Sequence, residues 1–566
     1  METAKGKRPS TPGAGPFIPF HSKRRRGGVE RHGILYSICA LLPVGRQGEG
    51  PGMDRHETPR GWQADTALIG LLALAKLALH LAFVNRYGYF RDELYYLACG
   101  RHLDWGYVDF PPGIGLLAAL LQRTLGDSLL ATRFLPILAG AGLVFITGLI
   151  AREFGGKRYA QCLAALCALA APVLLANHHL LGVNAFEQFL WVLAVYVFVR
   201  ILRTGELKLW LVFGLVAGAG LMTKLTFLFF GVSVLTGLLL TRHRRMLLTP
   251  WPWLGGAIAL ALFLPHLLWQ ITHDWPTLTL TAAYASGKTY DASLLEAVYM
   301  QIMSVHPFSA PVWLAGLWFL LWDKEGKNYR AIGWGAVFLA VTFTALKAKF
   351  YWMAPVHCAV LAAGACALEK VAREKGWSGL KCAYPAVLVT GAALTAPLAL
   401  PILPPEQAVV YNGLLGGDAG LRHEKVALRG LPQHFADMFG WPELVALVAE
   451  VYEGLPEDEK SGCAILCGDY GNAGAVDLFG KKYGLPRAIS THNAYHLWGP
   501  GEYAGGPVIA IGIAEDELKT LFDETTVAAT FTNPYCMPSE DNKPIFVCRG
   551  LRVDLEQAWA RAANYM

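Results

Sequence analysis

Charged residues are scarce in this chain. Asp, Glu, Lys and Arg make up 16% of its 566 residues, whereas hydrophobic residues make up 54%. Soluble domains carry about 25% charged residues, so the composition excludes an ordinary soluble protein. Cysteine gives no indication of a metal site either, because the eleven cysteines include no CxxC pair and no Cys/His spacing typical of zinc.

The chain contains long apolar runs with few charged residues. Between residues 64 and 402 they recur with lengths of about 17–25 residues, which is enough to cross a bilayer. The sequence therefore predicts an α-helical polytopic membrane protein with about eleven transmembrane helices. The expected spans are 64–84, 130–151, 159–177, 185–203, 208–222, 225–241, 253–271, 305–322, 331–347, 352–369 and 382–402.

Basic residues gather in alternate loops between these spans. The positive-inside rule assigns such loops to the cytoplasm, which places the N-terminus in the cytoplasm and the tail after residue 402 on the other side. The residues that carry this pattern are Arg152, Lys157, Arg158, Arg203, Lys208, Arg242, Arg244, Arg245, Lys324, Lys327, Arg330, Arg373, Lys375 and Lys381.

Three regions of the chain differ in composition. Residues 1–60 are rich in Gly, Pro and Arg and lack a periodic apolar face, so we expect disorder there, with Met53 as a candidate translation start. Residues 61–402 form the expected transmembrane domain, whose first exterior loop is 85–129. Residues 403–566 alternate helical patterns with short apolar strands, which predicts a soluble extracytoplasmic α/β domain.

The charge is divided unevenly between these regions. From residue 404 onward there are 12 Lys and Arg against 22 Asp and Glu, whereas the rest of the chain has 37 against 21. The overall net charge of +6 thus comes from short loops and the N-terminal segment. This distribution is typical of membrane orientation and does not indicate a nucleic-acid partner.

Two cysteines of the tail are candidates for a disulfide. Disulfides form and persist outside the cytoplasm, which is where the tail is expected to lie. Cys536 and Cys548 are separated by a length of chain that suits a short hairpin. A bridge between them and a pair of free thiols are the two alternatives.

The first exterior loop carries adjacent carboxylates. Asp92 and Glu93 follow Arg91 just beyond a span end, where one carboxylate can act as a general base while the other orients it. Tyr95, Tyr96 and the segment 105–112, which contains Asp109, add aromatic and acidic groups to the same loop. The alternatives are a solvated acidic helix start for the carboxylates and an interfacial aromatic belt for the rings.

Further ionisable residues lie at other turns on the same predicted face. Glu187 lies within an apolar run, where a carboxylate is costly unless it has a partner. Lys224 and Lys349, the latter close to Tyr351, break the positive-inside bias, and a phosphate ligand would explain them. A structural ion pair for Glu187 and snorkelling of the lysines to lipid headgroups are the alternatives.

The first-loop segment, which reads Arg-Asp-Glu-Leu-Tyr-Tyr and then Trp-Gly-Tyr-Val-Asp-Phe-Pro-Pro, resembles the signature of bacterial glycosyltransferase family 39 membrane proteins. These proteins are related to the dolichyl-phosphate-mannose protein mannosyltransferases and to the aminoarabinose transferase that modifies lipid A. Further segments that resemble the family are Asn184–Glu187, Leu221–Lys224, Lys349–Pro355, Tyr470–Ala475 and Asn533–Pro538.

The resemblance implies a GT-C fold in a bacterial inner membrane and an enzyme that moves a sugar from a polyprenyl-phosphate donor to an envelope lipid, glycan or protein, with inversion. It implies that Asp92 is the catalytic acidic residue and that Glu93 is its supporting acid. It also places Glu187 near the acceptor and Lys224 and Lys349 near the donor phosphate. Some family members use a divalent metal and others need none, so the resemblance leaves the metal open.

Two other classes of function compete with glycosyl transfer. A transporter or flippase for a lipid-linked or anionic solute would also need charges within the membrane region. Transporter sites, however, tend to lie near the bilayer midplane on broken helices, often with inverted repeats, and this sequence has no evident repeat. A binding scaffold with an inactive site is the third alternative. Donor-dependent glycan transfer distinguishes the three.

Overall fold

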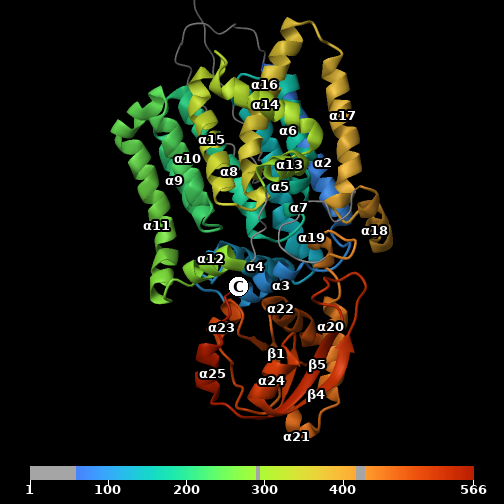
Figure 1. The fold of residues 1–566 in the computed structure, drawn as a ribbon. Coiled ribbons are helices and arrows are strands. Elements are labelled where there is room, and N and C mark those ends of the chain that lie inside the picture. Colours follow the sequence, from blue (N-terminus) through green and yellow to red (C-terminus); the bar gives the residue numbers. More distant parts are fainter. Residues whose placement is uncertain (1–58, 288–292, 416–427, 566) are drawn as a thin grey trace, which may run out of the picture. The chain divides into compact units, whose positions relative to one another are not determined.

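The computed structural model describes residues 59–287, 293–415 and 428–565. The prediction of disorder for residues 1–60 lies almost entirely outside the described residues. The first part of the described chain is helical (Figure 1). Its α-helices are α2 (Pro59–Phe83), α3 (Arg91–Arg101), α4 (Gly113–Leu125), α5 (Leu129–Glu153), α6 (Arg158–Ala170), α7 (Pro172–Asn177), α8 (Val183–Thr204), α9 (Leu209–Leu221), α10 (Phe227–Leu239), α11 (Pro250–Thr272), α12 (Pro276–Gly287), α13 (Leu294–Ser304), α14 (Ala310–Leu321), α15 (Arg330–Ala345), α16 (Ala354–Glu374) and α17 (Leu380–Thr395).

The chain is a multi-pass membrane protein. Among the described residues, five helices are long and apolar enough to cross a bilayer, and they lie at 65–83, 129–153, 183–204, 250–272 and 350–374. The pair formed by α13 and the helix that ends at Leu321 bends by 94° and would make a sixth span. The remaining predicted runs form shorter helices, for example α9 and α10 with 13 residues each. The predicted number of eleven spans therefore stays a prediction.

Glycine allows several of these helices to approach one another closely. A Cβ on Gly316 of α14 would lie 1.9 Å from the carbonyl oxygen of Val360, and a Cβ on Gly364 of α16 would lie 1.8 Å from that of Val312. These distances leave no room for a side chain, so α14 and α16 pack backbone to backbone. Small residues at such interfaces are typical of helix packing in membranes.

The second part of the chain is a mixed α/β region, as predicted. A five-stranded sheet has the order β2-β1-β3-β5-β4, in which β1 is parallel to β2 and β3, while β5 is antiparallel to β3 and β4. The strands are β1 (Ala464–Cys467), β2 (Ala488–Ser490), β3 (Val508–Ile511), β4 (Phe522–Phe531) and β5 (Lys543–Leu551). The helices are α18 (Pro405–Leu414), α19 (Gln433–Ala436), α20 (Trp441–Glu453), α21 (Glu457–Lys460), α22 (Tyr470–Phe479), α23 (Ala494–Trp498), α24 (Glu515–Leu521) and α25 (Leu555–Arg561).

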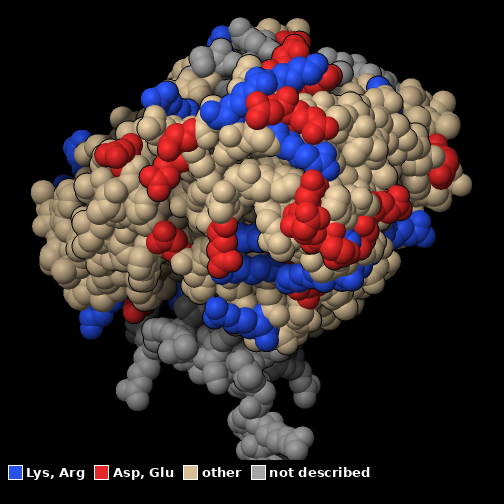
Figure 2. All heavy atoms as spheres, turned by 90° about the horizontal axis from the view of Figure 1, so that it is seen from below, with Lys and Arg blue, Asp and Glu red and all other residues tan. Residues whose placement is uncertain are grey.

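The surface of this region is polar. Figure 2 looks onto this end of the molecule and shows side chains of both signs interleaved over it. Exposed ion pairs contribute to the pattern, for example Lys519 with Glu515 at 2.7 Å and Arg552 with Asp523 at 2.7 Å. Such a surface is typical of a domain in water.

The predicted disulfide is not formed. Cys536 and Cys548 are both buried free thiols. Cys548 lies in β5 and belongs to the apolar cluster that includes Phe546 on one face of the sheet, whereas Cys536 belongs to the cluster that includes Val547 on the other face. Successive strand residues point to opposite faces, so the sheet itself separates the two sulfur atoms.

We expect Gly364→Val to destabilise the helical region. Its side chain would meet backbone atoms of α14, which cannot yield as a flexible side chain can, and overpacking of this kind typically costs about 1–3 kcal/mol or more. The measurement is the apparent melting temperature of the purified protein in detergent. Gly256→Val in α11 is the matched control, because nothing lies within 4 Å of its Cβ position. Equal melting temperatures for the two variants would contradict the close contact.

Candidate active site

Glu93 joins several elements at a buried point. Its side chain is 0% exposed and accepts hydrogen bonds from the Phe90 backbone N–H at 2.9 Å and the Leu181 backbone N–H at 2.8 Å. Arg133 of α5 donates to both carboxylate oxygens, at 3.0 and 2.8 Å. The bond to Phe90 also caps the first turn of α3, as a carboxylate at the third helical position does. Glu93 therefore positions the first loop, and its oxygens are committed to these four bonds.

Asp92 lies next to Glu93 but faces the α/β region. Its Oδ1 accepts a hydrogen bond from the Tyr470 hydroxyl at 2.9 Å, and the side chain is partly buried. Tyr470 is the first residue of α22, so the two partners come from opposite ends of the chain. In the sequence, Tyr470 lies in a segment that resembles the family, but no role at the site was predicted for it.

Asp109 is a further carboxylate of the first loop and lies near Asp92. Its Oδ1 accepts a hydrogen bond from the buried Tyr95 hydroxyl at 3.0 Å. Burial raises the pKa of Asp109 from 3.8 to about 7, although the bond from Tyr95 opposes the rise, and the negative charge of Asp92 adds to it. Asp109 thus exchanges a proton near neutral pH.

Tyr96 connects the first loop to a second group of side chains. Burial raises its pKa well above the ordinary value, and the charges of Asp92 and Asp109 together with Tyr351 act in the same direction. These electrostatic contributions require Asp92, Asp109 and Tyr351 each to lie near Tyr96. The two parts of the site also touch where the Gly113 backbone N–H donates to the Met222 carbonyl oxygen at 2.8 Å.

Lys224 organises this second group. Its ammonium donates to Asn184 Oδ1 at 2.8 Å and to Glu187 Oε2 at 3.2 Å. The same nitrogen lies over the rings of Tyr351 and Trp352, 5.4 and 5.2 Å from their centroids. Glu187 also accepts a hydrogen bond from Thr226. The structure therefore unites three predicted residues, from α8, from the turn between α9 and α10, and from the short helix η4 (Phe350–Met353).

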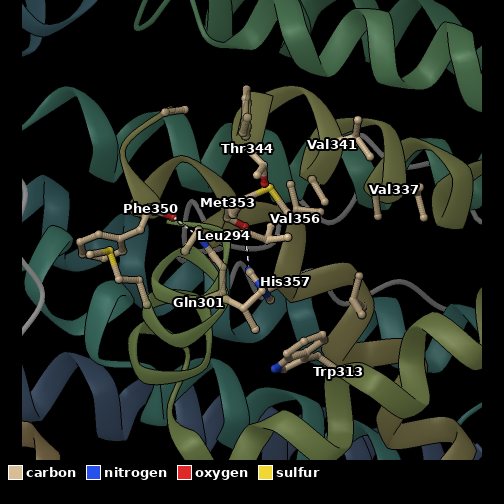
Figure 3. A pocket seen from close by; sticks show the side chains of 18 of the residues that line it. Leu294, Gln301, Trp313, Val337, Val341, Thr344, Phe350, Met353, Val356 and His357 are labelled. Carbon is tan, nitrogen blue, oxygen red and sulfur yellow. Dashed lines mark hydrogen bonds between the residues drawn. The ribbon is translucent and has the colours of Figure 1, made fainter. Parts of the chain in front are cut away.

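Lys349 lines an apolar cavity of about 320 Å³. Helices α13, α14, α15 and α16 with η4 form its wall, and Figure 3 shows Leu294, Val341 and Val356 among the side chains around it. Gln301 donates to the Phe350 carbonyl oxygen at 3.0 Å across one part of the wall. Lys347 and Lys349 are also among the described residues that line the cavity. The cavity thus combines an apolar interior with cationic groups.

Some residues of the site had weak or unused signals in the sequence. Arg133 lies inside an apolar run, where a charge is costly unless it is paired, and this position could have indicated it. The segment after β1 gave no such signal for Asp469, which forms an ion pair with Arg91 at 3.4 Å. The described residues contain no group of three or more His, Cys, Asp or Glu side chains suited to a metal ion. Because the carboxylate oxygens of Glu93 are committed to four hydrogen bonds, the Asp92-Glu93 pair does not fit a metal site.

Part of the sequence matches a known protein family. Residues 109–269 match the sequence profile of the family described as dolichyl-phosphate-mannose-protein mannosyltransferase. Over these residues the chain is similar to this family. The predicted family and the predicted enzyme class, a membrane glycosyltransferase, are thereby confirmed. No curated protein matches the sequence significantly.

Solved structures share the fold of this glycosyltransferase. The crystal structure of ArnT from Cupriavidus metallidurans in the apo state aligns with a TM-score of 0.57 and 16% identity over 86% of this chain and 98% of that chain. The structure of the same protein bound to undecaprenyl phosphate aligns with a TM-score of 0.54 and 16% identity over 87% and 98%. At this identity the likeness shows a common GT-C fold.

We expect Arg133→Met to destabilise the glycosyltransferase strongly. The substitution leaves the Glu93 carboxylate buried without its partner, and breaking a buried ion pair in this way costs about 3–5 kcal/mol. Thermal unfolding in detergent measures the effect. Lys519→Met, at the exposed pair with Glu515, is the control and should leave the melting temperature unchanged within error, because exposed pairs contribute little. A similar small effect for Arg133→Met would contradict the role given to this pair.

We also expect Asp109 to make stability depend on pH. Its pKa is raised in the folded state, so between about pH 4 and 7 the folded protein binds a proton that the unfolded chain releases. Stability therefore falls as pH rises through this window. Asp109→Asn, which resembles the protonated form, should gain in melting temperature relative to the wild type from about pH 4 to 7, with no further gain above. Parallel pH profiles of the two proteins would contradict this assignment.

Proposed function

We propose that this glycosyltransferase moves a sugar from a polyprenyl-phosphate donor to an acceptor of the cell envelope, on the extracytoplasmic face of a bacterial inner membrane. The observation that carries the proposal is that Asp92, Asp109 and Tyr351 each lie near Tyr96, while the Lys224 ammonium lies over the Tyr351 ring. The predicted domains fit this function, with residues 61–402 as the transmembrane domain and 403–566 outside the cytoplasm. The sugar donor, the acceptor lipid, glycan or protein, and the membrane are the partners it requires.

The cavity supports a donor with an apolar tail and a phosphate. A polyprenyl chain needs an apolar surface within the membrane region, and the wall of the cavity supplies one. Lys is a compact charge that suits a phosphate group, and Lys347 and Lys349 line the same cavity. ArnT from Cupriavidus metallidurans, which shares the fold, was crystallised with undecaprenyl phosphate.

The reaction is proposed to be a single displacement with inversion. The acceptor hydroxyl gives its proton to Asp92, and its oxygen forms a bond with the anomeric carbon. The bond from that carbon to the phosphate oxygen breaks, and polyprenyl phosphate leaves with the electron pair. Lys224 and Lys349 stabilise the charge that grows on the phosphate, since preorganised charges are usually the largest contribution to such catalysis.

The other residues of the site hold the substrates or the base. Asp109, with a pKa of about 7, can donate or accept a hydrogen bond with sugar hydroxyls near neutral pH. Arg91 and Tyr95 stabilise the loop, Arg91 through its ion pair with Asp469 and Tyr95 through its hydrogen bond to Asp109. Glu187 fixes Lys224 and so acts on the donor phosphate through it. Tyr96 lies near Asp92, Asp109 and Tyr351, and the Tyr351 ring lies beside the Lys224 ammonium.

We expect Asp92→Asn to abolish transfer. The gene is deleted in its host and replaced with the wild type or a variant at equal expression, and envelope glycolipids and glycoproteins are compared by mass spectrometry. The wild type should restore a hexose-sized or pentose-sized mass that the deletion removes. Asp92→Asn should not, because loss of a general base costs about 10²–10⁴-fold in rate.

Asp516→Asn, on the exposed side of α24, is the matched control and should restore the mass fully. Purified Asp92→Asn should still bind undecaprenyl phosphate in native mass spectrometry, since the cavity and its lysines are unchanged. Full restoration by Asp92→Asn would exclude Asp92 as the base. A deletion that alters the distribution of a lipid-linked sugar across the membrane, without loss of any glycan product, would favour the transporter alternative instead.

A further inference from the structure

The α/β region contacts the first loop through the edge of its sheet that usually binds ligands. In open α/β sheets, ligands bind outside the carboxyl ends of the parallel strands, where the strand order reverses. Here β1 lies between β2 and β3, so the loops after these strands meet at that edge. The loop after β1 carries Asp469 and Tyr470, and the loop after β2 carries His492. All three residues are directed at α3 or at one another, as their contacts show.

Tyr470 is held in place on several sides. Its ring stacks on Tyr95 with centroids 4.6 Å apart and on His492 at 4.9 Å, and the Arg91 guanidinium lies 4.8 Å from its centroid. Its backbone N–H donates to His492 Nδ1 at 3.3 Å. These contacts leave the ring little freedom to turn, so the hydroxyl is aimed at Asp92 Oδ1.

Asp469 anchors the same corner. It accepts hydrogen bonds from the backbone N–H groups of Gly471 and Asn472 at 2.7 and 3.1 Å, which caps α22. Burial by itself would raise its pKa, but the positive charges of Arg91 and Lys543 and the helix-capping bond from Asn472 hold it below the ordinary value. Asp469 is therefore ionised and binds Arg91, the residue that precedes Asp92.

The close contact between α22 and α3 also requires glycine at two positions of α22. A Cβ on Gly471 would lie 2.7 Å from Arg91 Cγ, and a Cβ on Gly474 would lie 2.9 Å from the Leu94 carbonyl carbon. Glycine at both positions lets α22 rest on the backbone of α3. In addition, the Ala494 backbone N–H donates to the Tyr95 hydroxyl at 3.1 Å. The α/β region thus contacts the loop on both sides of Asp92.

We propose that Tyr470 is a positioning residue for Asp92, and that the α/β region is for this reason part of the catalytic machinery. This inference rests on the proposed function, in which Asp92 is the base. The phenol O–H fixes the rotation of the carboxylate, and a hydrogen bond donated to a carboxylate stabilises its charged form. The aromatic stack on Tyr95 and His492 keeps the phenol in place during each turnover.

The test compares Tyr470→Phe with the wild type in membranes of the deletion host, whose own donor and acceptor supply the reaction. Initial rates of glycan product are measured by mass spectrometry from pH 5 to 9. The variant keeps the ring and loses the hydroxyl, so its rate at neutral pH should fall about tenfold to hundredfold, as expected for a lost hydrogen bond to a charged group. The acid limb of its pH profile should also move upward by about one pH unit.

Tyr503→Phe is the matched control, because its hydroxyl donates to the Gly506 carbonyl oxygen at 2.8 Å within the same region. It should leave both the rate and the pH profile unchanged. A wild-type rate and pH profile for Tyr470→Phe, in a preparation where Asp92→Asn is inactive, would overturn the role of Tyr470 and leave the proposed function intact. A lower rate with an unmoved acid limb would show a merely structural effect and would also overturn it. Full activity of Asp92→Asn would instead exclude Asp92 as the base, and the proposed role of Tyr470 would then fail together with the proposed function.

Discussion

The buried ion pair between Glu93 and Arg133 is the interaction on which the site depends. Removing two charges from water is costly, and the cost is repaid only when geometry and additional hydrogen bonds are good. Both conditions hold, because Arg133 forms two bonds to Glu93 and donates further to the Val84 and Gly88 carbonyl oxygens. The pair thereby connects the end of α2, the start of α3, α5 and the turn before α8. Asp92 has a defined place because its neighbour in sequence is fixed in this way.

Three separate parts of the chain then complete the site. The first loop supplies two carboxylates, the turn between α9 and α10 supplies Lys224, and the α/β region supplies Tyr470. Tyr96 lies near Asp92, Asp109 and Tyr351, and the Lys224 ammonium lies over the Tyr351 ring while it pairs with Glu187.

Much of this arrangement could be predicted from the sequence, because it follows from local patterns. Apolar runs indicated a polytopic helical protein, and alternating patterns indicated the α/β region. A charge inside an apolar run indicated Glu187, and a break in the positive-inside bias indicated Lys224. The sequence left a disulfide and two free thiols open for Cys536 and Cys548, and the structure has free thiols, since proximity in sequence does not tell which face of a sheet a thiol occupies. The number of membrane spans could not be fixed either, because breaks in helices depend on packing as well as on composition.

The sequence by itself determined which residue types stand at the site and that most of them come from one predicted face of the membrane region. Only the tertiary structure decided their partners. Glu93 reads as a second catalytic carboxylate until Arg133, 40 residues away, binds it, and Asp92 acquires its hydrogen bond from a tyrosine 378 residues away. Side chains so distant in sequence meet only because the helices and the sheet place them together. The energy of a buried charge depends on those contacts and not on its neighbours along the chain.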